Sequence, residues 1–118
     1  MKAEIKGFHS PDVNWEGGAP ADPQNFGILL QLFIGPKDAP GSESFDLIVC
    51  TPSWLGQIVK GGPIIGRHHL VVSTFDVSAI ASYLKAEVAN YSAPDWEQLA
   101  GKLTRIGRWE FEDYVEEE

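Results

Sequence analysis

Alternation of apolar and polar residues predicts four strands, over residues 2–8, 26–34, 44–51 and 64–72. Every second residue from 26 to 34 is apolar, which makes this the clearest strand of the chain. Leu29 and Phe33 add apolar side chains to its second face, beside Gln31. Apolar residues on both faces indicate a central strand that is at least partly covered on each side.

Apolar residues at helical spacing predict three helices. Thr51 and Pro52 form a typical helix start for a short helix, whose apolar face would be Trp54, Leu55, Ile58 and Val59. Asp76 is placed to cap a second helix. A third helix is predicted to begin at the Ser-x-x-Asp pattern of residues 92–95 and to end before Gly107. The helical stripes place Trp54 and Trp96 in the predicted core.

The order of these elements predicts an α+β fold. Three strands precede the short helix, and a fourth strand precedes the two main helices. We expect a single two-layer domain over residues 1–118, with a mostly antiparallel sheet of about four strands. The long Pro- and Gly-containing segment 9–25 is predicted to be a loop.

Negative charge is concentrated at the C-terminal end. The chain has 17 acidic and nine basic residues, a net charge of −8, and six of the acids lie in residues 110–118. An acidic field beside aromatic side chains favours a basic partner and disfavours nucleic acid or an anionic membrane. We therefore predict a partner-binding surface made of Trp109, Glu110, Glu112, Asp113, Tyr114 and Trp15. Trp15 is included as an aromatic residue of the 9–25 loop that is expected to be exposed.

Two parts of this prediction stay open. Trp109 is interpreted either as a binding hot spot or as an anchor that holds the tail on the core. The terminal acids, residues 116–118, are expected to steer a partner more than to contact it.

The composition is typical of a cytoplasmic protein. No apolar run approaches the roughly 20 residues that span a bilayer, and the first residues lack the apolar core of a signal peptide. Cys50 is the only cysteine, so no intrachain disulfide is possible.

Candidate catalytic and metal-binding residues are few. His68 and His69 would point to opposite faces of a strand, so we predict no metal site and no cofactor. Cys50 lies in an apolar strand, where burial disfavours a reactive thiolate. An alternative hypothesis remains: a small ligand-binding domain or enzyme with a pocket near His68, Cys50 and Gln31. An oligomer subunit is a third possibility.

Several ordered segments resemble immunity protein family eight of bacterial polymorphic toxin systems. The resemblance covers nearly the whole chain, in residues 8–12 (FHSPD), 25–27 (NFG), 30–36 (LQLFIGP), 43–46 (ESFD), 50–55 (CTPSWL), 66–70 (GRHHL) and 105–114 (RIGRWEFEDY).

This resemblance implies a non-enzymatic cytoplasmic protein that binds and neutralises a cognate toxin. Many toxins of such systems are nucleases, whose substrate grooves are basic. We therefore expect the partner to be a toxin with a basic surface, held by the acidic surface described above.

Overall fold

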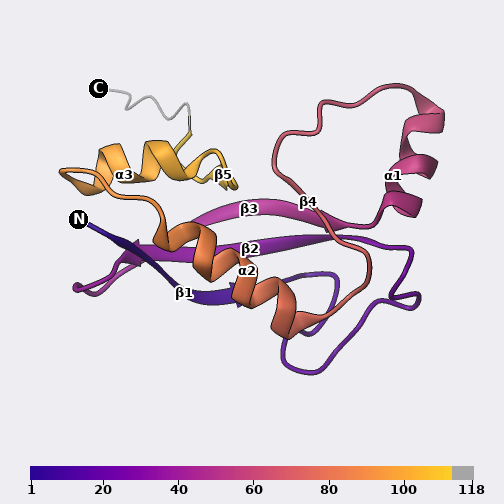
Figure 1. The fold of residues 1–118 in the computed structure, drawn as a ribbon, viewed down its shortest axis with the longest axis horizontal. Coiled ribbons are helices and arrows are strands. Elements are labelled where there is room, and N and C mark those ends of the chain that lie inside the picture. The colour runs from indigo at the N-terminus through magenta and orange to yellow at the C-terminus, as the bar shows by residue number, and fades with distance from the viewer. Residues whose placement is uncertain (113–118) are drawn as a thin grey trace.

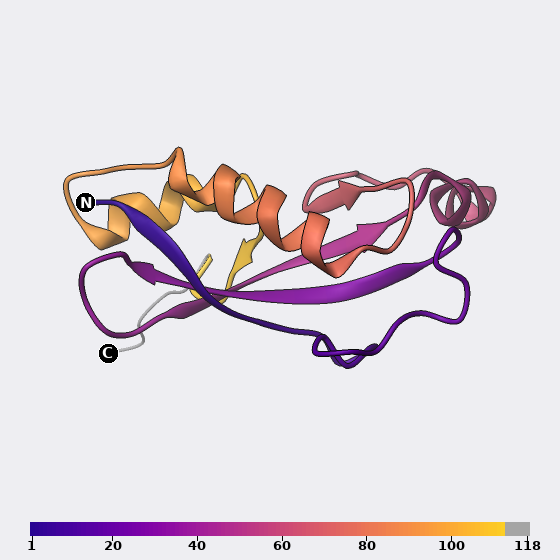
Figure 2. The ribbon, with the colours of Figure 1, turned by 60° about the horizontal axis from the view of Figure 1, so that its bottom comes forward.

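A five-stranded sheet carries two helices on one face in the computed structural model, which describes residues 1–112 (Figures 1 and 2). The strands are β1 (Ala3–His9), β2 (Gly27–Pro36), β3 (Glu43–Cys50), β4 (His69–Val71) and β5 (Arg108–Trp109). The helices are α1 (Pro52–Ile58), the 3-10 turn η1 (Val59–Gly61), α2 (Val77–Ala89) and α3 (Trp96–Leu103). The predicted α+β fold is confirmed, and the short β5 is an addition to it.

The sheet is antiparallel except at one edge of β3. β1, β2 and β3 pair in order as antiparallel neighbours. The outer edge of β3 is shared by two short strands: β5 pairs antiparallel with Phe45 and Asp46, and β4 pairs parallel with residues 48–50. The chain therefore returns twice to the same strand edge.

One face of the sheet forms the core, because every second residue of β2 and β3 is apolar and points toward α2 and α3. The sheet contributes seven buried side chains to this core, which are Ile28, Leu30, Leu32, Ile34, Phe45, Leu47 and Val49. The helices contribute six, which are Ile80, Leu84, Val88, Leu99, Ala100 and Leu103. Trp96 is half-buried against this core, where its ring meets Phe45 edge to face with a centroid distance of 6.4 Å.

Aspartate caps fix the starts of both main helices. The carboxylate of Asp76 accepts a hydrogen bond from the Ala79 amide at 3.1 Å, as predicted for the second helix. Asp95, rather than Ser92, caps α3, and it accepts from the Gln98 amide at 2.9 Å. Ser92 instead forms an isolated bridge with Lys2, so the predicted start of the third helix was early.

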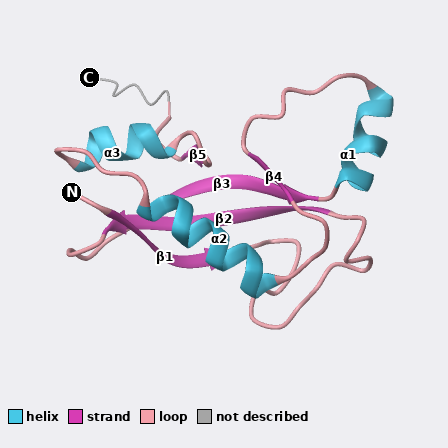
Figure 3. Cartoon of the chain, viewed as in Figure 1, coloured by secondary structure: helices cyan, strands magenta, loops and turns pink. Residues whose placement is uncertain are grey.

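The short helix α1 forms with proline at its start, but its predicted buried face is wrong. None of its residues is fully buried, and Ile58 is 40% exposed. Only Trp54, half-buried, packs closely onto the sheet, over Gly27. α1 leads away from the sheet (Figures 1 and 3), and Ile58 and Val59 at its far end stay exposed.

Most of the strand predicted over residues 64–72 is loop. Only His69–Val71 pairs with β3, because the rest of that edge is taken by β5. His68 precedes the strand with a φ of 61°, a left-handed conformation that breaks the alternation. Residues 52–67, comprising α1, η1 and the following loop, project from the sheet and are called the arm below (Figure 3).

Replacing Gly27 tests how the arm is attached. A Cβ at Gly27 would overlap the Trp54 ring, so Gly27→Ala should displace that ring and lower the free energy of unfolding by about 1–3 kcal/mol. Gly56→Ala is the matched control, because a Cβ there meets nothing within 4 Å and alanine favours the helix by about 0.5–1 kcal/mol. Urea unfolding monitored by tryptophan fluorescence measures both, and equal effects would contradict this attachment.

Candidate partner-binding face

The second face of the sheet is not covered by α2 or α3. Strand alternation places Leu29, Gln31 and Phe33 of β2 on this face, together with Asp46 and Ile48 of β3. These five side chains are half-buried. Figure 2 shows α2 and α3 together on the opposite side of the sheet. We call this surface the open face.

A row of polar residues crosses the open face. His9, Gln31, Asp46 and Arg108 are register partners across β1, β2, β3 and β5. Side chains directly opposite one another in neighbouring strands lie about 5 Å apart, so the four form one continuous polar row. Gln31 lies directly opposite Asp46 in the ladder between β2 and β3.

Asp46 is the residue of this row whose carboxyl pKa is raised above its ordinary value. Burial raises the pKa of its carboxyl, the neighbouring charge of Glu110 raises it further, and Gln31 and Arg108 act in the opposite direction. Its Oδ1 atom is buried without a hydrogen-bond partner among the described residues. A cation supplied by another molecule beside this carboxyl group would favour its ionised form.

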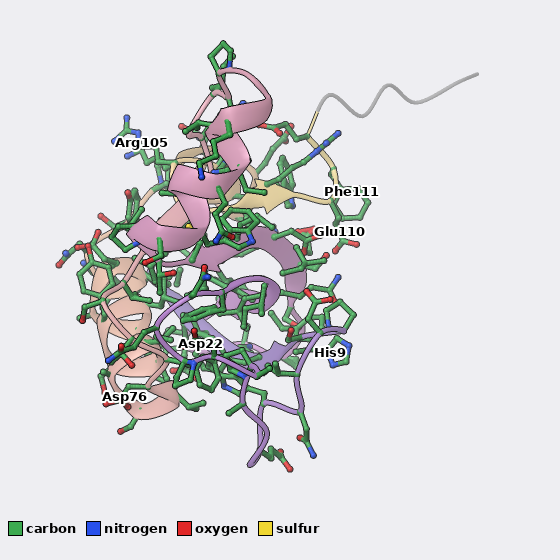
Figure 4. The ribbon with its side chains drawn as sticks, turned by 90° about the vertical axis from the view of Figure 1, so that its right-hand side faces the viewer. His9, Asp22, Asp76, Arg105, Glu110 and Phe111 are labelled. Atoms are coloured by element: carbon green, nitrogen blue, oxygen red, sulfur yellow. The ribbon has the colours of Figure 1, made fainter. Side chains whose placement is uncertain are left out.

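Glu110 continues the β5 ladder at the border of the open face. Its amide donates to the Ser44 carbonyl at 3.0 Å, and its carboxylate accepts from the Ser44 amide at 2.9 Å. The side chain remains exposed. Glu110 and Phe111 lie on the same side of the sheet as His9, away from α2 (Figure 4). Glu110 can therefore act with Asp46 as one acidic site.

Glu112, which was predicted to bind a partner, is paired with two basic side chains of its own chain. Its carboxylate pairs with Arg67 at 2.5 Å and with Arg108 at 3.9 Å, and its side chain is 18% exposed. These ion pairs compensate its charge and join the end of the arm to β5. A contact between residues 45 positions apart in the chain gives no signal in local spacing.

Trp109 lies on the helix side of the sheet. Its ring stacks on Phe45 with a centroid distance of 6.3 Å and an interplanar angle of 9°, and it contacts Phe111 edge to face. The side chain is half-buried, and its Nε1 has no hydrogen-bond partner within residues 1–112. Of the two roles left open above, this geometry favours the anchor.

Trp15 is half-buried and is not brought next to Trp109. It stacks on Phe8 at 5.5 Å and meets Phe75 edge to face at 6.1 Å. Phe8 lies on β1, three strands away from Trp109 on β5. The remaining predicted site residues, Asp113 and Tyr114 with the terminal acids 116–118, lie outside the described residues.

The alternative pocket near Cys50 and His68 gains no support from their contacts. Cys50 is fully buried, and burial raises the pKa of its thiol, which disfavours the nucleophilic thiolate. His68 donates from Nε2 to the Thr104 carbonyl at 2.6 Å and so caps the end of α3.

Residues 1–112 contain no cluster of three or more His, Cys, Asp or Glu side chains arranged to hold a metal ion. No helix in the same range is long and apolar enough to cross a membrane.

The polar row was not predicted from the sequence. A signal was present, since Gln31 and Asp46 are single polar residues inside otherwise apolar strands. Their alignment with His9 and Arg108 depends on strand register, and the bulge between Ile5 and Gly7 shifts that register by one residue.

Asp46→Asn is expected to stabilise the protein at neutral pH. The folded state holds the Asp46 proton more tightly than the unfolded chain, so ionisation costs folding free energy as pH rises above the ordinary value of 3.8. The asparagine removes that cost and should raise the melting temperature by about 2 °C at pH 7, a small effect because water screens a partly exposed group. The gain should vanish below pH 3.8, where Asp46 is protonated in both states. A gain that persists in acid would show that charge is not its cause.

Truncating Trp109 tests its anchoring role. Trp109→Ala should lower the free energy of unfolding by about 2–3 kcal/mol, because it removes the stack on Phe45. Trp109→Phe keeps a ring on Phe45 and removes a buried N–H without a partner, so it should cost less than about 1 kcal/mol. Denaturant titration compares the variants, and an alanine variant as stable as the original chain would rule out the anchor.

Comparison with known proteins gives one match. No curated protein and no solved structure is similar enough to be matched. The family described as Immunity protein 8 matches residues 3–114, which is nearly the whole chain and includes the open face, the arm and β5. The chain therefore belongs to the Immunity protein 8 family, the immunity proteins of toxin systems.

Proposed function

We propose that this immunity protein neutralises the toxin of a polymorphic toxin system by binding it through the open face. It acts in the cytoplasm as an inhibitor without catalytic activity of its own. Family membership supports the role in toxin immunity. The choice of surface rests on the geometry of the sheet.

The observation that carries this choice is the unsatisfied acidic site at Asp46 and Glu110. The negative charge of Glu110 raises the pKa of the Asp46 carboxyl there, and Oδ1 of Asp46 has no hydrogen-bond partner among the described residues. An Arg or Lys side chain of the toxin placed beside the two carboxylates would favour their ionised forms. Leu29, Phe33 and Ile48 surround the site with half-buried apolar surface, which excludes water and strengthens such a contact.

The charge of the chain supports a toxin with a basic groove, such as a nuclease. Residues 113–118 contain four of the 17 acids, which leaves 13 acids against nine bases in the described part. The whole chain keeps a net charge of −8, so it would attract a phosphate-binding groove from a distance and exclude nucleic acid after binding.

The first experiment is co-purification with the product of the adjacent upstream gene. A tight complex that abolishes the toxicity of that product is expected. Its affinity should fall as salt rises, because the contact joins opposite charges. A tight complex that is indifferent to salt would keep the immunity function and remove the acidic contact. Absence of a complex at any salt concentration would refute this toxin assignment.

Charge-neutral variants locate the contact. Asp46→Asn combined with Glu110→Gln keeps both side-chain shapes and the oxygen that accepts from Ser44. We expect the association rate with the toxin to fall about fivefold at low salt and its salt dependence to flatten. Stopped-flow mixing measures both quantities.

Glu87→Gln combined with Glu97→Gln is the matched control, since it also removes two negative charges, from α2 and α3 on the other side of the sheet. It should change the association rate by less than about twofold. If the control and the open-face variant slow association equally, only the total charge matters. The open face would then no longer be the proposed interface.

A further inference from the structure

The arm carries an unusual concentration of exposed apolar side chains. Of the eight large apolar residues that are exposed in the described chain, five lie in the arm or in β4, namely Ile58, Val59, Ile64, Ile65 and Val71. Ile65 is 86% exposed, more than any other of the eight. A contiguous group of this kind marks an interaction site more often than chance exposure.

These side chains contribute little to the fold. α1 has no fully buried residue, and Trp54 is the side chain that packs over Gly27. The far end of the arm is held by the ion pair between Arg67 and Glu112. The apolar tip between these two attachments is therefore held in place without being used in the core.

The charge of the arm is opposite to that of the rest of the protein. No acidic residue occurs from residue 47 to residue 75, a stretch that contains Lys60 and Arg67. The remaining parts of the chain hold all 17 acids and seven of the nine bases. A basic, apolar projection on an acidic protein fits a partner surface that is apolar and bordered by carboxylates.

The two attachments of the arm lie at the border of the open face. Gly27, which Trp54 covers, has the same strand phase as Leu29 and so belongs to that face. Arg67 reaches Glu112, two residues after Glu110. A protein seated on the open face would therefore meet the arm as well.

A second copy of this chain fits the arm less well. Closed dimers pair identical patches around a two-fold axis, and pairing of arm with arm would bring Lys60 close to its own copy. Like charges brought together in this way oppose association.

We propose that the arm is a second toxin-binding element, which inserts Ile64 and Ile65 into an apolar cleft of the toxin bordered by acidic side chains. This proposal rests on the toxin-neutralising function proposed above and assigns it a contact of opposite charge. Lys60 faces the acidic border, while the isoleucines supply the buried contact. Together the two surfaces require a toxin with a basic region and an acidic, apolar cleft at the spacing that the arm sets.

The test combines Ile64→Ser with Ile65→Ser and measures binding to the product of the adjacent upstream gene by surface plasmon resonance. Both side chains are exposed, so the melting temperature should not change. We expect the affinity to fall at least about 30-fold, mainly through faster dissociation. Tyr83→Ser is the control, since Tyr83 is 53% exposed on α2, outside the arm, and should change affinity less than about twofold.

Reversing the charge of the arm tests its sign. Lys60→Glu should weaken binding about tenfold if the cleft is acidic. Tighter binding of Lys60→Glu would show that the cleft is basic and would overturn the charge assignment.

The outcomes separate the two proposals. Unchanged binding of the isoleucine variant, or equal loss in the Tyr83 control, would refute the role of the arm and leave the immunity function standing. Failure of the unmodified protein to bind would refute both. A dimer that the isoleucine substitutions dissociate, with toxin binding unchanged, would assign the arm to self-association instead.

Discussion

The outer edge of β3 is the constraint on which the rest of the architecture depends. An unpaired edge of that length would leave backbone N–H and C=O groups without partners beside a buried core. The chain satisfies this edge with two short strands that approach from opposite ends, β4 in parallel and β5 in antiparallel. The parallel pairing requires a crossover, and the antiparallel one requires the chain to come back after α3.

Both candidate binding surfaces follow from this solution. The crossover between β3 and β4 is the arm, which projects at one end of the sheet, apart from the layer formed by α2 and α3 (Figure 1). The return to β3 places Arg108 and Glu110 beside Asp46 and completes the polar row. The Arg67 to Glu112 ion pair then links the crossover to the return.

The parts of the fold that sequence predicted well are those where local pattern and burial agree. β2 and α2 are examples, since alternation along one and the stripe of Ile80, Leu84 and Val88 along the other both face the core. The prediction failed for the apolar face of α1 and for much of residues 64–72. In both segments the apolar pattern is present, but burial depends on whether another segment covers it. The proposed site was predictable only in part: Glu110 was a candidate because it lies in the acidic C-terminal segment, whereas the place of Asp46 beside it depends on strand register.

The arrangement of the arm separates stability from recognition. Its attachments, Trp54 over Gly27 and Arg67 with Glu112, set its position, and the tip between them fills no part of the core. If the arm binds the toxin as proposed, substitutions at the tip would change what the protein binds without changing the free energy that keeps it folded. An immunity protein built this way can follow an altered toxin through changes at a few exposed positions, while the sheet and its helices remain the same.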